Sequence, residues 1–163
     1  MIKIEAVIFD WGDTLMRDFP HYEGPMLEWP EIEVLPGVAA TLKELKPDFT
    51  LAVASSACSS NGEMLRRALQ RGQIAHYFNF FLTGQELKSQ KPHLDFFRNI
   101  CCKVGYPPGQ CLMVGDNLEK DIIPARRLGM KAAWLTAEKE PQGDYWKISR
   151  IQEVLELIKG RAV

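Results

Sequence analysis

The sequence lacks a long hydrophobic run and an excess of charge of either sign. No apolar stretch approaches the roughly 20 residues that a membrane-spanning helix needs, and the N-terminus has no signal-peptide pattern. The 20 basic and 21 acidic residues give a net charge of −1. That balance argues against binding to nucleic acid or to a membrane surface through bulk charge. We therefore expect a cytoplasmic protein.

Cysteine is also scarce, and the sequence has no internal repeat or low-complexity segment. The four cysteines, Cys58, Cys101, Cys102 and Cys111, match no zinc-binding spacing, and we expect free thiols in a reducing compartment. A chain of 163 residues with 46% hydrophobic residues can bury a core of ordinary size. We expect residues 1–163 to form a single domain.

The chain does contain a regular alternation of apolar runs and amphipathic segments. The expected strands are Ile4–Asp10, Phe49–Ser55, Phe78–Leu82, Gln110–Gly115 and Lys131–Leu135. The expected helices are Gly37–Lys46, Ser59–Arg71, His93–Val104, Leu118–Leu128 and Ile148–Ile158. Continuous apolar runs are typical of strands buried on both faces. The pattern predicts a doubly wound, Rossmann-like three-layer α/β/α fold with a mainly parallel sheet.

Polar residues stand at the carboxyl ends of three expected strands, at Asp10, Ser55 and Asp116. Ligands of parallel α/β sheets bind at this edge. Lys91, just before a helix, and Asp121, just after Asp116, are further candidates. Three clustered carboxylates repel one another unless a cation neutralises them, and Mg²⁺ prefers such oxygen ligands. A hydroxyl, backbone N–H groups and a lysine would hold a phosphate, which one carboxylate could attack.

Four segments resemble, in order, the motifs of the haloacid dehalogenase (HAD) superfamily of hydrolases. They are VIFDWGDTL, LAVASS, KPHLDFF and VGDNLEKD, and the resemblance runs from Ile4 to about Leu135. It implies a HAD-like fold and a Mg²⁺-dependent phosphatase that works through an aspartyl-phosphate intermediate.

The resemblance implies a role for each matching residue near the phosphate. Asp10 would be the nucleophile, and Ser55, with Ser56 as its substitute, would bind the phosphoryl group. Lys91 would neutralise charge between the nucleophile and the phosphate. We add Asn117, within the fourth motif, as a further phosphate-binding candidate.

The same resemblance implies a metal site. Asp116 would hold Mg²⁺ together with Asp10 and the main-chain carbonyl of Gly12. Asp121 would support the ion directly or through water, or orient Lys91.

The first motif departs from the family pattern at position 12. Family phosphatases usually carry a general acid–base Asp two residues after the nucleophile, where this chain has Gly12, with Asp13 one step later. Three interpretations stay open: Asp13 substitutes, water or substrate substitutes, or catalysis is poor and the protein only binds phosphate and metal. Dehalogenation is a further alternative, which GDNLEKD disfavours because it keeps both acids of the fourth motif.

Residues 16–35 form a short irregular insertion, too short for a helical cap domain. We expect a capless member with an open site, suited to a phosphorylated small molecule or a phosphoprotein. Its aromatic residues either form a minimal lid or simply pack the loop onto the core; they are Phe19, His21, Tyr22 and Trp29.

Overall fold

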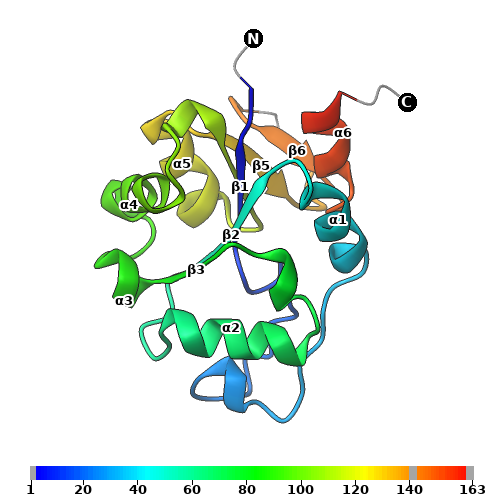
Figure 1. The fold of residues 1–163 in the computed structure, drawn as a ribbon, viewed down its shortest axis with the longest axis vertical. Coiled ribbons are helices and arrows are strands. Elements are labelled where there is room, and N and C mark those ends of the chain that lie inside the picture. Colours follow the sequence, from blue (N-terminus) through cyan, green and yellow to red (C-terminus); the bar gives the residue numbers. More distant parts are fainter. Residues whose placement is uncertain (1–2, 140–142, 161–163) are drawn as a thin grey trace.

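A computed structural model describes residues 3–139 and 143–160 of the chain (Figure 1). Within these ranges six parallel strands form one sheet in the order β3-β2-β1-β4-β5-β6. The strands are β1 (Ala6–Phe9), β2 (Thr50–Ser55), β3 (Phe80–Thr83), β4 (Cys111–Gly115), β5 (Lys131–Leu135) and β6 (Trp146–Ile148). The doubly wound parallel sheet predicted from the sequence is confirmed.

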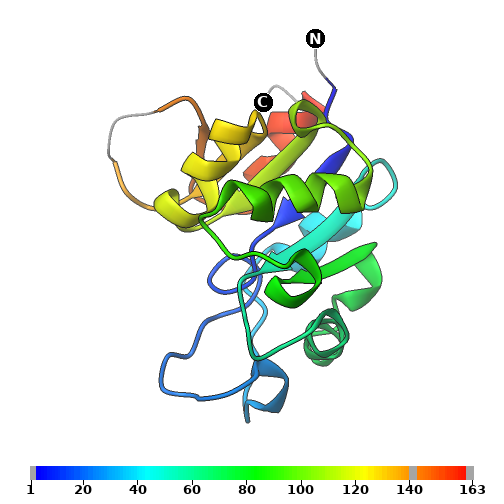
Figure 2. The same cartoon turned by 90° about the vertical axis from the view of Figure 1, so that its left-hand side faces the viewer.

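Helices cover both faces of the sheet, and Figure 1 shows them on either side of the strands, whereas Figure 2 looks onto the left-hand layer. One face carries α1 (Val38–Leu45), α2 (Gly62–Arg71) and α6 (Glu153–Lys159), and the other carries α3 (Gly84–Leu87), α4 (Leu94–Val104) and α5 (Ile123–Leu128). Val7 and Phe9 of β1 point into one core, and Ala6 and Ile8 point into the other. This two-sided burial explains why β1 is apolar without alternation. Among the described helices, none has the length and apolarity needed to cross a membrane.

The C-terminal part of the prediction is wrong in one respect. The expected helix Ile148–Ile158 begins later, since α6 spans Glu153–Lys159 and Ile148 belongs to β6. The backbone turns between them, where Glu153 accepts hydrogen bonds from the hydroxyl of Ser149 and the N–H of Arg150. A three-residue edge strand is too short to produce a recognisable apolar run.

The expected helix Leu118–Leu128 is also not uniform. Its first part, Leu118–Ile122, is a π-helical turn, and α5 follows from Ile123. Pro124 stands at the start of α5, where its missing N–H is tolerated. A proline in the middle of a continuous α-helix would instead lose a hydrogen bond and meet the preceding turn.

The third strand is displaced from the predicted Phe78–Leu82 to Phe80–Thr83. A 3₁₀ turn at Ala75–Tyr77 precedes it, and Phe78 caps that turn by donating its N–H to the carbonyl of Ala75. The unpredicted helix α3 follows, stabilised by a capping box in which Thr83 and Glu86 exchange hydrogen bonds.

The insertion, residues 16–35, has little regular structure beyond a 3₁₀ turn at Met26–Glu28. This turn lies beside α2 at the bottom of Figure 1. The Arg71 guanidinium of α2 donates to the carbonyls of Leu27 and Trp29, both at 2.7 Å. The rings of Phe19, Tyr22 and Trp29 contact one another. These aromatics therefore form a cluster of their own, whereas Met26 and Leu27 of the insertion pack against the core.

Candidate active site

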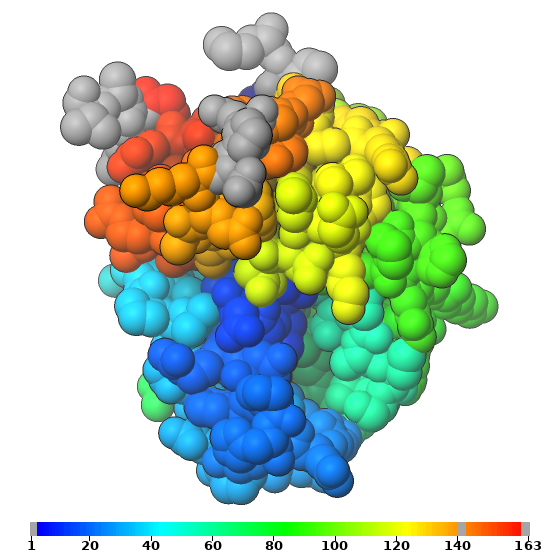
Figure 3. Space-filling view, turned by 180° about the vertical axis from the view of Figure 1, so that it is seen from behind, coloured from blue at the N-terminus to red at the C-terminus, as the bar shows by residue number. Residues whose placement is uncertain are grey.

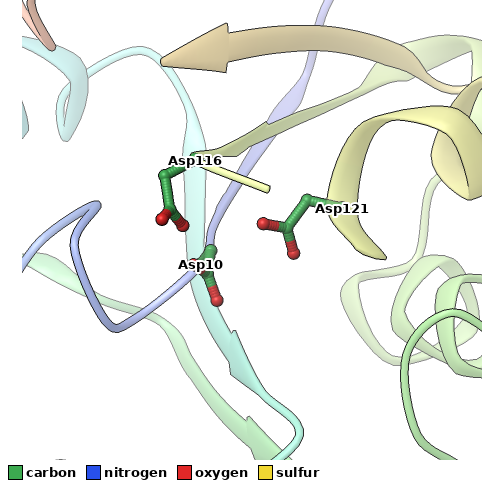
Figure 4. A group of neighbouring side chains, drawn as sticks. All are labelled: Asp10, Asp116 and Asp121. Atoms are coloured by element: carbon green, nitrogen blue, oxygen red, sulfur yellow. The ribbon is translucent and has the colours of Figure 1, made fainter. Parts of the chain in front are cut away.

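The order of the strands brings distant acidic residues to one edge of the sheet. β1 lies between β2 and β4. The strands β2 and β3 follow on one side of β1, and β4 to β6 follow on the other, so the strand order switches beside β1. Asp10 follows β1 and Asp116 follows β4, and the Asp10 N–H donates to the carbonyl of Val114 at 2.9 Å. Asp121 comes from the π-helical turn after β4. Figure 4 shows the three carboxylates gathered at one place. One ligand oxygen from each lies within 4.8 Å of the other two.

Lys91 pairs with two of these carboxylates. Its ammonium nitrogen lies 2.7 Å from Oδ1 of Asp10 and 2.7 Å from Oδ1 of Asp121. The side chain of Lys91 is only 5% exposed, so both ion pairs are shielded from water. One ammonium cannot balance three carboxylates, and the cluster keeps an excess of negative charge.

Ser56 and Lys91 are joined through the backbone. The hydroxyl oxygen of Ser56 accepts a hydrogen bond from the Lys91 N–H at 3.0 Å. This contact fixes the segment that carries Lys91 against the end of β2. Ser56, predicted to bind phosphate as a substitute for Ser55, lines the site, and its hydroxyl hydrogen remains available to a ligand.

Ser55 makes a similar contact with the backbone. It is 8% exposed, and its hydroxyl oxygen accepts a hydrogen bond from the Ala57 N–H at 3.1 Å. The hydroxyl hydrogen remains available to a ligand. Asn117 uses its side-chain oxygen to cap the helical turn through the N–H of Lys120, at 2.9 Å. Asn117 lines the same cavity, so its predicted contact with phosphate would come from its remaining groups.

Thr14 is a site residue to which sequence reasoning assigned no role. Its fully buried hydroxyl lies 3.2 Å from Oδ2 of Asp10 and 3.4 Å from Oδ1 of Asp116. A hydroxyl has one proton, so it donates to one of these oxygens at a time. The position of Thr14 in the first motif, four residues after Asp10, could have indicated from the sequence that it belongs to the site.

Burial raises the pKa of Asp116 to about 7, and the neighbouring Asp10 and Asp121 add to this shift. Burial and the charge of Asp10 also raise the pKa of Asp121 to about 6, although Lys91 opposes the change. Burial alone would lower the pKa of Lys91, but the two carboxylates outweigh it and the pKa is raised. The surroundings therefore disfavour the ionised forms of Asp116 and Asp121.

Two observations indicate that the acidic cluster suits a hard divalent cation. Oδ1 of Asp121 is buried and, apart from its ion pair with Lys91, makes no well-aligned hydrogen bond within the described chain. A Cβ on Gly115 would lie 2.4 Å from Oδ2 of Asp121, so only glycine lets this carboxylate come so close to β4. Carboxylate oxygens that share excess negative charge are the donors that Mg²⁺ prefers.

Asp13 lies at the exposed rim of the site, whereas Gly12 is partly buried and lines the cavity beside Asp10. Asp13 is exposed, with a left-handed backbone (φ 56°), and its Oδ1 accepts a hydrogen bond from the Asp18 N–H at 3.0 Å. Partial burial, together with the charges of Asp13 and Asp10, raises the pKa of Asp18. Sequence reasoning did not single out Asp18, because it lies in an irregular segment outside every motif.

These residues surround one cavity of about 380 Å³. Asp10, Lys91, Asp116 and Asp121 form part of one wall, and an apolar wall is made by residues of the insertion and of α2: Met26, Leu27, Trp29, Met64, Leu65 and Ala68. Figure 3 shows a recess where the blue N-terminal segment, the teal segment after β2 and the yellow-green segment after β4 meet. The cavity thus joins a charged end to an apolar end.

The sequence of this chain is similar to a known family and to several named proteins. A family model described as "Haloacid dehalogenase-like hydrolase" matches residues 6–135. N-acylneuraminate-9-phosphatase from Rattus norvegicus is 32% identical over 99 residues, which cover 60% of this chain and 39% of that protein. Phosphoglycolate phosphatase from Pasteurella multocida is 33% identical over 154 residues, which cover 88% of this chain and 66% of that protein. The chain thus spans less than two thirds of the length of each.

A solved structure resembles the chain over nearly its whole length. It is the crystal structure of an uncharacterized protein from Listeria monocytogenes serotype 4b, with a TM-score of 0.80 and 27% sequence identity. The match covers 96% of this chain and 99% of the other.

Proposed function

This chain belongs to the haloacid dehalogenase-like hydrolase family, and from that premise we propose that it is a Mg²⁺-dependent phosphatase. The observation that carries the proposal is the environment of Asp10. Its Oδ1 meets the Lys91 ammonium at 2.7 Å, and its Oδ2 accepts a hydrogen bond from Thr14. A carboxylate fixed in this way at the wall of a cavity is suited to nucleophilic attack.

In the proposed reaction, a carboxylate oxygen of Asp10 attacks phosphorus while the ester P–O bond breaks and the alcohol leaves. The resulting aspartyl phosphate is then hydrolysed by water to Asp10 and inorganic phosphate. Lys91 reduces the repulsion between the carboxylate and the phosphate dianion. The Ser55 hydroxyl, whose oxygen already accepts a hydrogen bond from the Ala57 N–H, donates a hydrogen bond to a phosphoryl oxygen. Thr14 fixes the orientation of Asp10 from the opposite side.

The Mg²⁺ ion would be held by Asp10, Asp116, Asp121 and the carbonyl of Gly12. When bound, it supplies positive charge that stabilises the phosphoryl group in the transition state. The raised pKa values of Asp116 and Asp121 support this assignment, because burial disfavours their ionised forms and a bound cation would stabilise them.

The test is hydrolysis of a panel of phosphomonoesters, including sugar phosphates and phosphopeptides, with and without Mg²⁺. We expect phosphate release that EDTA removes, that Mg²⁺ restores and that Asp10→Asn abolishes. Activity that needs no metal and survives Asp10→Asn would refute the proposal.

Gly12 favours a second candidate, a protein that binds phosphate and metal but turns over poorly. Loss of a general acid–base typically lowers the rate about 100- to 10,000-fold. Binding of phosphate with Mg²⁺, without hydrolysis of any ester in the panel, would support this candidate. Halide release without metal would instead support a dehalogenase.

A phosphorylated small molecule is the substrate that we favour, since the relatives reported above are named for reactions on small phosphate esters. A phosphoprotein stays the alternative. We also propose that residues 16–35 act as a minimal lid on a single-domain chain, because Met26, Leu27 and Trp29 line the cavity. The cytoplasmic location stays a prediction.

A further inference from the structure

Gly12 is not required by the backbone at its position. Its φ lies outside the left-handed region, and a Cβ built on it would meet no atom closer than 3.6 Å. An L-residue with a side chain would therefore fit without displacing its neighbours. The neighbour that such a side chain would meet is Asp18, whose Cβ lies 3.6 Å and Oδ2 4.0 Å from the Cβ position. The carboxyl group of Asp18 thus lies beside the Cβ position of residue 12.

Asp18 lines the same cavity as Asp10 and Lys91. Its backbone is held in place from the turn that follows β1, because its N–H donates to Oδ1 of Asp13 at 3.0 Å. No hydrogen bond or ion pair engages the Asp18 carboxylate within the described ranges, so this group is free to meet a ligand in the cavity. Asp13, by contrast, already uses an oxygen for this contact.

We propose that Asp18 is the general acid–base of this enzyme and that Asp13 is a positioning residue that holds Asp18 beside Gly12. The inference rests on the proposed phosphatase function. In this chain the acid would come from the insertion, residues 16–35, and not from the position two residues after the nucleophile. The insertion would therefore complete the catalytic site rather than only cover it.

Two proton transfers define the proposed role of Asp18. In the first step an Asp10 oxygen forms a bond to phosphorus while the ester P–O bond breaks, and protonated Asp18 gives its proton to the departing oxygen. The alcohol leaves neutral. In the second step water forms a bond to phosphorus while the Asp10–phosphorus bond breaks, and the Asp18 carboxylate takes a proton from that water. Inorganic phosphate is released and protonated Asp18 is restored.

The test compares two esters that differ in their need for an acid. An alkyl phosphate has a poor leaving group that must be protonated, whereas 4-nitrophenyl phosphate releases a stabilised anion. The parameter to compare is kcat/KM, which covers the steps through formation of the aspartyl phosphate. We expect Asp18→Asn to lower kcat/KM for the alkyl ester about 100-fold or more, and for the nitrophenyl ester by much less.

The rival acid is tested in parallel. Asp13→Asn keeps the Oδ1 acceptor and suits a left-handed backbone, and we expect it to lower kcat/KM for the alkyl ester by about tenfold or less. Asp95→Asn, exposed on α4 and outside the cavity, is the surface control and should leave the activity unchanged. Thermal unfolding of each variant separates loss of folding from loss of chemistry.

Rescue provides the sharpest comparison. Gly12→Asp in an Asp18→Ala background restores an acid at the same place, and we expect at least about tenfold recovery relative to Asp18→Ala alone. Equal losses for both esters, a larger loss in Asp13→Asn, or no recovery in the double variant would overturn the role of Asp18. If wild-type protein hydrolyses no ester, the proposed function fails as well. If it does so in an Asp10-dependent manner while Asp18→Asn is fully active, only this inference fails.

Discussion

The ammonium of Lys91 lies 2.7 Å from Oδ1 of Asp10, although 81 positions separate the two residues in the chain. After β2 the chain passes through α2, β3 and α3 and then returns to the carboxyl end of β1, where Asp10 lies. The Lys91 N–H is fixed there by the hydroxyl of Ser56. The ion pair is therefore a product of the parallel sheet, which brings separate loops to one edge.

Removing Lys91 tests how far this pair supports the fold. Lys91→Met would remove the ion-pair partner of the buried Asp121 and of the partly buried Asp10. Breaking a buried pair from one side typically lowers the free energy of unfolding by about 3–5 kcal/mol. We expect a loss in that range in metal-free protein, smaller when Mg²⁺ is added. Urea unfolding with and without Mg²⁺ measures both.

The matched control is the exposed Lys88, three residues earlier. Lys88→Met should change the free energy of unfolding by about 0.5 kcal/mol or less, as for most surface substitutions. Equal stability of the two variants would contradict the account of the charge cluster.

The raised pKa values of Asp116 and Asp121 predict that the free energy of unfolding depends on pH. The pKa of Asp116 rises from 3.8 to about 7 and that of Asp121 from 3.8 to about 6, so in this range the native chain binds more protons than the unfolded chain. The contribution of these groups to the free energy of unfolding is therefore greatest at acidic pH and falls as pH rises through that window.

Mg²⁺ needs both carboxylates ionised, so its effect has the opposite trend. We expect Mg²⁺ to raise the unfolding temperature strongly at about pH 8 and little at about pH 5. Thermal scans at both pH values measure this, with Asp116→Asn as the variant in which the rise should shrink at the higher pH. The same rise at both pH values would count against these carboxylates as ligands.

Gly115 sets the position of Asp121. A Cβ at residue 115 would lie 2.4 Å from Oδ2 and 2.6 Å from Cγ of Asp121. We expect Gly115→Ala to push the carboxylate away and to weaken Mg²⁺ binding about 10- to 100-fold, the range found when support of a ligand is lost. Calorimetric titration with Mg²⁺ measures the affinity.

A double-mutant cycle identifies the origin of that effect. The stability lost on Gly115→Ala should be smaller in an Asp121→Ala background, where the clashing atoms are absent. An equal loss in both backgrounds would mean that the strain lies elsewhere in β4.

The sequence predicted the sheet and most of the cluster because both depend on local patterns. Asp10 and Asp116 stand at the ends of continuous apolar runs, and such ends meet at one edge of a parallel sheet whatever the loops do. The placement of Asp18 could not be predicted, since it depends on the path of an irregular insertion. The edge strand β6, with three residues, was missed because its burial comes from pairing with β5 and not from its own pattern.

The central claim, that Asp10 attacks phosphorus, is tested most directly by acid quenching the protein within milliseconds of mixing with Mg²⁺ and a phosphomonoester. Peptide mass spectrometry then locates any phosphoryl group. The account predicts phosphorylation of Asp10, formed and lost at rates compatible with turnover, and absent from Asp10→Asn. Steady phosphate release with no adduct on Asp10, or with the adduct on another residue, would contradict it.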